Sequence, residues 1–183
     1  MTQAALSTKV RAGILQELSR RFQPSQIEIQ DPERQGAVIR RGRVLVLTGG
    51  EVPAKPFRVV QVGRTHKVRQ HVMDFARVDI APSGRLRAEP GPFTLSKGTQ
   101  LVVLDLKLTG DELHLLAHTA DPLGVQPGGD LVYGCTEFVF HLEPATLAGG
   151  SVEPIVAAVE RWLEGNLVHR TCQQGVREIC IEP

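Results

Sequence analysis

Aromatic residues, cysteines and long apolar runs are all scarce in this sequence of 183 residues. Aromatic side chains make up 4% of the chain, so the stacking platforms on which proteins hold single-stranded bases are few. Three cysteines are too few for a small secreted scaffold held together by disulfides. No apolar stretch approaches the roughly 20 residues that a membrane-spanning helix needs, so we expect no transmembrane segment.

Common motifs of catalytic and cofactor sites are also absent from the sequence. The sequence contains no G-x-S-x-G nucleophile elbow and no glycine-rich phosphate loop of either common type. Gly149-Gly150-Ser151 precedes a predicted helix, but no Lys or Arg follows in the first turn, which favours an ordinary helix entry over an anion site. The sequence therefore predicts no cofactor, no metal and no catalytic residue set.

The first residues lack the basic, apolar and small-residue regions of a secretory signal, so the sequence as written indicates a cytoplasmic protein. A chain that begins after a removed signal has the same features, which makes export the alternative. In an exported protein we expect a disulfide between Cys172 and Cys180, and in a cytoplasmic one we expect two thiols. Cys135 lies in an apolar segment and is expected to be a core residue.

The clearest pattern in the chain is a β-hairpin between Lys97 and Ala120, with Gly110-Asp111 as the central residues of a type II′ turn. On the aliphatic face this register pairs Leu108 with Leu113, Leu106 with Leu115, Leu104 with Ala117, and Val102 with Thr119. On the mixed face it pairs Lys107 with His114, Asp105 with Leu116, and Val103 with His118. A slip of one residue would mix the two faces, so the pattern and the turn predict the same register.

His114 and His118 have the spacing of two metal ligands on a helix. The hairpin instead places them on a strand, where four residues separate them by about 13 Å, too far to share one ion. We therefore expect His114 to form a solvated polar pair with Lys107. We also expect the carboxylates of Asp111 and Glu112 to be solvated in the turn.

Two helices are predicted outside the hairpin. Residues 6–22 carry an apolar stripe with Pro24 beyond its end, and residues 152–164 follow the candidate cap Ser151 and precede Gly165 at the position of a C′ glycine. We expect the first helix to be capped by Ser7 or Thr8. The buried residues expected on the two helices are Leu6, Val10, Ile14, Leu15, Leu18, Phe22, Ile155, Val156, Val159, Trp162 and Leu163.

Alternating apolar residues predict strands over 26–30, 37–47, 57–62 and 131–142, and a short final strand over 176–181. The second of these is either one bulged strand or two strands joined at Gly42, and the fourth is expected to bulge between Gly134 and Glu137. Residues 66–80 fit a helix or a strand, and we favour a strand. Segments rich in Gly and Pro predict connections over 48–56, 82–98 and 121–130.

These elements predict one mainly-β α+β domain over residues 1–183. Its β-rich core, about residues 26–142, is expected to form an antiparallel sheet or small barrel of about six to eight strands. An amphipathic helix precedes this core and another follows it, and a tail occupies residues 166–183. Closure into a barrel would remove the exposed edges that so apolar a sheet ought to avoid.

The charge is unevenly distributed although the net charge is only +1. Residues 34–87 hold twelve Lys and Arg against three Asp and Glu, whereas residues 88–183 hold five against thirteen. Compensation between the two halves within one fold is the favoured interpretation. The alternative is an anion-binding patch made by Arg40, Arg41, Arg43, Arg58, Arg64, Lys67 and Arg69.

Three functional hypotheses remain. We favour a non-catalytic binding or assembly module that recognises a protein partner or a ligand through its sheet, because a well-specified β scaffold carries no visible reactive set. The first alternative is a nucleic-acid or polyanion binder that uses the basic segment 40–69. A sequence pI of about 7.8 is low for that class. The second alternative is an enzyme whose residues converge from distant loops. The sequence identifies neither the partner nor an oligomeric state.

Overall fold

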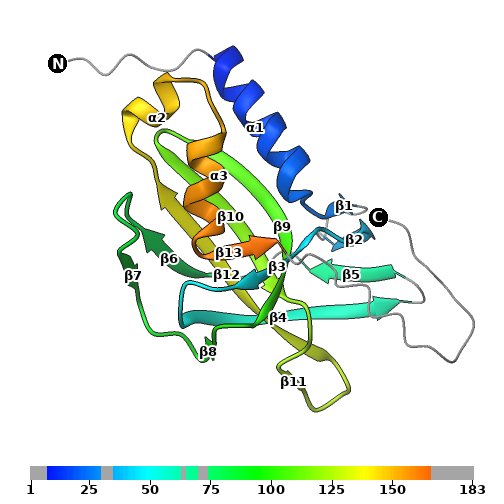
Figure 1. Cartoon of the computed structure of the whole chain (residues 1–183). Helices are drawn as coiled ribbons and strands as arrows, with labels where there is room; N and C mark the ends of the chain where they lie inside the picture. The colour runs from blue at the N-terminus through cyan, green and yellow to red at the C-terminus, as the bar shows by residue number, and fades with distance from the viewer. Residues whose placement is uncertain (1–7, 30–34, 63–64, 70–73, 166–183) are drawn as a thin grey trace, which may run out of the picture.

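The computed structural model describes residues 8–29, 35–62, 65–69 and 74–165, and this part of the chain is mainly β (Figure 1). Its helices are α1 (Thr8–Phe22), α2 (Pro144–Ala148) and α3 (Glu153–Glu160). Its strands are β1 (Gln26–Ile29), β2 (Gln35–Arg40), β3 (Val44–Leu47), β4 (Val52–Val62), β5 (Thr65–Arg69), β6 (Ala76–Ile80), β7 (Leu86–Ala88), β8 (Phe93–Leu95), β9 (Gln100–Thr109), β10 (Glu112–Thr119), β11 (Gly124–Val125), β12 (Leu131–His141) and β13 (Leu163–Gly165).

The strands form one curled sheet with the order β1-β2-β5-β4-β12-β10-β9-β3-β13, and β6, β7, β8 and β11 pair at its sides. Among the described strands no pairing joins β1 to β13, so the sheet is an open half-barrel. The expected antiparallel sheet is wrong in one respect, because β6 runs parallel to β12 with Ala76 opposite Thr136. The expected six to eight strands were also too few, because short edge strands such as β7, β8 and β11 have no alternating pattern of their own.

The central hairpin forms as predicted near its turn. Gly110 has a φ of 59°, as a type II′ turn requires, and Leu108, Lys107, Leu106 and Asp105 face their predicted partners on β10. Farther from the turn the predicted register is wrong by one residue, because a bulge places Ala117 opposite Val103 and His118 opposite Val102. The extra residue is Leu104, which is buried, so either register would have kept this run of apolar side chains out of water.

Two other predicted segments divide in the structure. Residues 37–47 form two strands that separate to opposite ends of the sheet, since β2 pairs β1 and β5 while β3 pairs β9 and β13. The connection expected over 48–56 is wrong from Val52 onward, where β4 begins. Pro53 and Pro56 are tolerated there because this part of β4 has a paired strand on one side at a time, first β8 and then β12.

Residues 66–80 contain strands β5 and β6, as favoured, and no helix in the part that is described. Ala76, Val78 and Ile80, the alternate residues of β6, are buried together on one face, as the strand prediction requires. The bulge expected between Gly134 and Glu137 is wrong, because β12 pairs with β10 in continuous register. In this segment both odd-numbered residues, such as Tyr133 and Cys135, and even-numbered ones, such as Phe138 and Phe140, are apolar. The cause is that β12 is buried on both faces.

The helices begin and end close to the predicted residues, with local differences. Ile14, Leu18 and Phe22 of α1 are buried, whereas Val10 is 39% exposed. Helix α3 ends earlier than expected, and Gly165 lies in β13 instead of capping a helix. The N-cap residue is Val152, although the backbone N–H of Glu153 does donate to Ser151 Oγ at 3.4 Å. The short helix α2 was not predicted. The strand expected over 176–181, and Leu6 with Ser7, lie outside the described residues.

One large apolar core occupies the side of the sheet where the helices pack. Side chains of α1, α2 and α3 join it together with residues of β3, β4, β6, β9, β10, β12 and β13, and Figure 1 shows the three helices on this side. A second, small cluster on the other side contains Phe57, Tyr133 and Cys135. No helix in the described part of the chain is long and apolar enough to cross a membrane.

Candidate functional site

The sheet face opposite the helices carries polar side chains on three neighbouring strands. Along each strand they alternate with residues of the main core, which places them together on the outer face. The register sets Arg77 beside Glu137, and His141 beside Glu112. We call this set the carboxylate–histidine network, and its members are Arg77, Asp79, Glu112, His114, Glu137 and His141.

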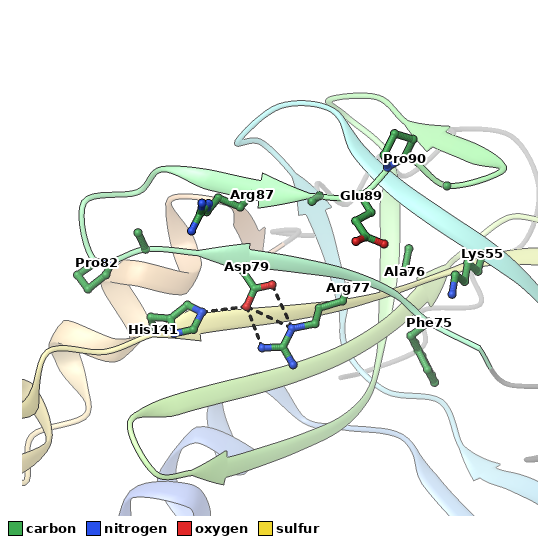
Figure 2. A pocket seen from close by; sticks show the side chains of 13 residues that line it. Lys55, Phe75, Ala76, Arg77, Asp79, Pro82, Arg87, Glu89, Pro90 and His141 are labelled. Atoms are coloured by element: carbon green, nitrogen blue, oxygen red, sulfur yellow. Dashed lines mark hydrogen bonds and ion pairs between the residues drawn. The ribbon is translucent and has the colours of Figure 1, made fainter.

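His141 links carboxylates from the strands on either side of it. Its Nε2 lies 2.9 Å from Oδ1 of Asp79, and its Nδ1 lies 3.4 Å from Oε1 of Glu112. Figure 2 shows the His141 and Asp79 side chains pointing toward one another from β12 and β6. A neutral imidazole carries one N–H, so it donates to one of these carboxylates at a time.

His114 is held in the same way one position further along the sheet. Its Nδ1 lies 2.8 Å from Oε1 of Glu137 and its Nε2 lies 3.2 Å from Oε2 of Glu112, with 16% of the side chain exposed. The expected solvated pair with Lys107 is therefore wrong, although the two residues do face each other in the register. The expectation that Glu112 is solvated is also wrong, because this carboxylate bridges both histidines.

Arg77 and Asp79 form the best-defined ion pair of the network. The Nη2 of Arg77 lies 2.8 Å from Oδ1 of Asp79 and its Nε lies 3.0 Å from Oδ2, a two-pronged contact drawn in Figure 2. Hydrogen bonding from Arg77 lowers the pKa of Asp79 below its usual value, and His141 acts in the same direction, while partial burial opposes both. The aspartate is accordingly held in its charged form.

Replacing Asp79 with asparagine should make the protein less stable at neutral pH by about 1 kcal/mol, a value between that of an exposed pair and that of a buried charged hydrogen bond. Because folding lowers the pKa of Asp79, the stability it contributes is present above the usual value of 3.8 and is lost as the pH falls through the folded-state value. The difference between wild type and Asp79→Asn in urea unfolding should therefore shrink in acid.

Asp74→Asn is the matched control for this experiment. The Asp74 carboxylate pairs with Lys55 at 2.8 Å, but 73% of its side chain is exposed, so its removal should change stability little. An equal loss in both variants, or a difference for Asp79→Asn that grows in acid, would contradict the role given to Asp79.

A cleft of about 990 Å³ lies beside the network, between β6, β7 and the chain that leads to β8 (Figure 2). Its apolar lining consists of Phe75, Ala76, Ala81, Pro82, Ala88, Pro90 and Gly91, and its polar lining consists of Lys55, Arg77, Asp79, Arg87, Glu89 and His141. Figure 2 shows Arg87 and Glu89 on β7 and just beyond it, above the Asp79 and Arg77 side chains of β6. The cleft thus has an apolar part and a polar part of similar size.

The described lining of the cleft consists of carboxylates, cations, one imidazole and apolar side chains. No serine, threonine or cysteine occurs among the described residues that line the cleft. In the described parts of the chain, no three His, Cys, Asp or Glu side chains are arranged to hold a metal ion. Cys135 lies under the outer face, and burial raises the pKa of its thiol, so it stays protonated near neutral pH.

The basic residues singled out from the sequence fall in a different region, on strands β2, β4 and β5 and before β3. Arg40 and Arg41 are exposed, and Arg41 donates to the carbonyl of Ala120. Arg43 donates to the carbonyl of Arg21 at 2.8 Å. Only the backbone positions of Arg58, Lys67 and Arg69 are described, and Arg64, Cys172 and Cys180 lie outside the described residues.

None of the network's carboxylates, and neither arginine of the cleft, was predicted from the sequence to belong to a site. The available signal was local, since Arg77 and Asp79 alternate with the apolar residues of β6, which predicts an outward direction for both. Outward-facing charges are ordinary on any sheet, so this signal identified no site. No protein-family model matches the chain, and no curated protein and no solved structure is significantly similar to it.

Proposed function

We propose that this protein is a non-catalytic binding module whose ligand, or a segment of whose partner protein, lies in the cleft beside the carboxylate–histidine network. The observation that carries the proposal is the cleft itself. Its volume of about 990 Å³ is at the upper end of the roughly 300–1,000 Å³ of ligand sites. Its lining also joins apolar walls to charged side chains that can fix the orientation of a ligand.

The network favours binding over catalysis. A general base must offer a free atom to a substrate proton, yet both ring nitrogens of His141 already face carboxylates. Both oxygens of Asp79 are also bonded, to Arg77 and to His141. The hydrogen bonds and ion pairs of the network link β6, β12 and β10 to one another at the edge of the cleft. A preformed wall of this kind lowers the entropic cost of binding a ligand.

Filling the cleft should weaken binding without unfolding the protein. Ala88 is exposed on β7 and lines the cleft, so an Ala88→Trp side chain has room to enter it. We expect wild type to bind one molecule of N-phenyl-1-naphthylamine, an uncharged fluorescent probe, and Ala88→Trp to bind it at least about tenfold more weakly. A fluorescence titration measures both affinities.

Ala157→Trp is the matched control, because Ala157 is exposed on α3 and does not line the cleft. It should bind the probe as wild type does. A wild-type protein that fails to bind the probe, or equal affinities in wild type and Ala88→Trp, would contradict the proposal. Unfolding curves of the two variants show whether each is folded.

A second candidate function, binding of nucleic acid or another polyanion, is favoured by the strand order. Strands β2, β5 and β4 are neighbours in the sheet, and they carry Arg40, Arg58, Lys67 and Arg69. This alternative predicts retention on immobilised heparin that weakens as salt rises and weakens further in the double variant Arg40→Gln, Arg41→Gln. The cleft proposal predicts no difference between that variant and wild type.

A further inference from the structure

We infer that the cleft takes an organic molecule with a single anionic group, and that Arg87 is its counter-charge. This inference rests on the proposed function, because it names the class of ligand for the same cleft. It starts from the charges that line the cleft. Three of them are positive and two are negative; these residues are Lys55, Arg77, Arg87, Asp79 and Glu89.

Arg87 is the cation of the cleft that has no carboxylate partner among the described residues. Lys55 is paired with Asp74 at 2.8 Å. Arg77 is paired with Asp79, which neutralises the second cation. The Arg87 side chain is exposed on β7, where its donors are available to a ligand.

Asp79 lies opposite Arg87 in the register but does not neutralise it. Oδ1 of Asp79 accepts from Arg77 and from His141, and Oδ2 accepts from Arg77. The carboxylate is therefore turned toward β12 and away from β7, as Figure 2 shows. The network thus leaves the guanidinium of Arg87 without a carboxylate partner in the part of the chain that the structure describes.

The chemistry of the lining selects the ligand class. A guanidinium presents a planar fork of N–H donors that matches a carboxylate, a sulfonate or a phosphate oxygen pair. Apolar residues on both sides of the cleft, such as Phe75, Pro82 and Pro90, offer contact to an organic body that an inorganic ion does not have. Glu89, the other charged residue of β7's end of the cleft, would repel a second or third negative charge, which favours a monoanion over a polyphosphate.

Two fluorescent probes of similar shape test this inference, namely 8-anilinonaphthalene-1-sulfonate, which is a monoanion, and the uncharged N-phenyl-1-naphthylamine. We expect Arg87→Gln to weaken binding of the sulfonate about tenfold and to leave the uncharged probe unaffected. Arg87→Lys keeps the charge but loses the fork, so its effect on the sulfonate should be intermediate. The control is Arg85→Gln, an exposed arginine that does not line the cleft and whose loss should change neither affinity.

The outcomes separate the inference from the function on which it rests. The inference is wrong if Arg87→Gln binds the sulfonate as wild type does, or if it loses affinity for both probes equally. The proposed function still stands in that case, provided that wild type binds the uncharged probe and Ala88→Trp binds it more weakly. If the uncharged probe does not bind wild type, the proposed function fails first. Octanoate should displace the sulfonate at far lower concentration than inorganic phosphate does, and equal potency would overturn the requirement for an organic body.

Discussion

Truncating Leu106 to alanine is expected to lower the free energy of unfolding by about 2–5 kcal/mol, the usual range for a buried leucine. Leu106 is 5% exposed and lies directly opposite the fully buried Leu115 on the neighbouring strand. The two leucines belong to the main core, on which α1, α2 and α3 pack. Removing three carbons there leaves a cavity that the rigid neighbouring strands fill poorly. The expected loss of stability is therefore well above that of a substitution on the surface.

Lys107→Ala is the matched control on the same strand, because its side chain is 65% exposed. Its effect should stay within about 0.5 kcal/mol of wild type. Urea unfolding followed by Trp162 fluorescence measures both variants, since this single tryptophan is buried in the same core. A loss below about 1 kcal/mol for Leu106→Ala would mean that the hairpin does not pack against the core in the described register.

The central hairpin could be predicted because its information is local. A turn residue with positive φ, Gly110, and an alternating pattern within a few residues on either side fix which residues face one another. The prediction failed only beyond Leu116, where Val102, Val103 and Leu104 are all apolar. Such a run satisfies either register equally well, so no residue in it signalled the bulge.

The carboxylate–histidine network could not be predicted because it depends on a non-local pairing. Arg77 and Glu137 are sixty residues apart in the sequence, and only the parallel pairing of β6 with β12 brings them side by side. A parallel pair leaves no turn between its strands from which a register can be inferred. The cleft has the same origin in part, because the same parallel pairing brings Asp79 of β6 within reach of His141 of β12. Arg87 joins it through the antiparallel pairing of β7 with β6, two strands that are close in the sequence.

The second large effect is expected where the chain passes from β2 to β3. A Cβ added at the buried Gly42 would overlap the carbonyl oxygen of Val103 and would also meet the backbone N and Oγ of Ser25. Ser25 holds this junction together, since its Oγ donates to the Val103 carbonyl at 2.8 Å and accepts from the Gly42 N–H at 2.8 Å. The obstructing atoms are mostly backbone, so they have little freedom to move aside.

Gly42→Ala should therefore destabilise the protein by about 3 kcal/mol or more, because overpacking and the loss of the Ser25 hydrogen bonds act together. Gly13→Ala is the control, since a Cβ added at this exposed position of α1 meets nothing within 4 Å. It should instead raise stability by about 0.5–1 kcal/mol, because glycine is unfavourable inside a helix. Thermal and urea unfolding measure both variants. If Gly42→Ala unfolds like wild type, Gly42 does not pass between Ser25 and Val103, and the described junction of α1, β1, β3 and β9 is wrong.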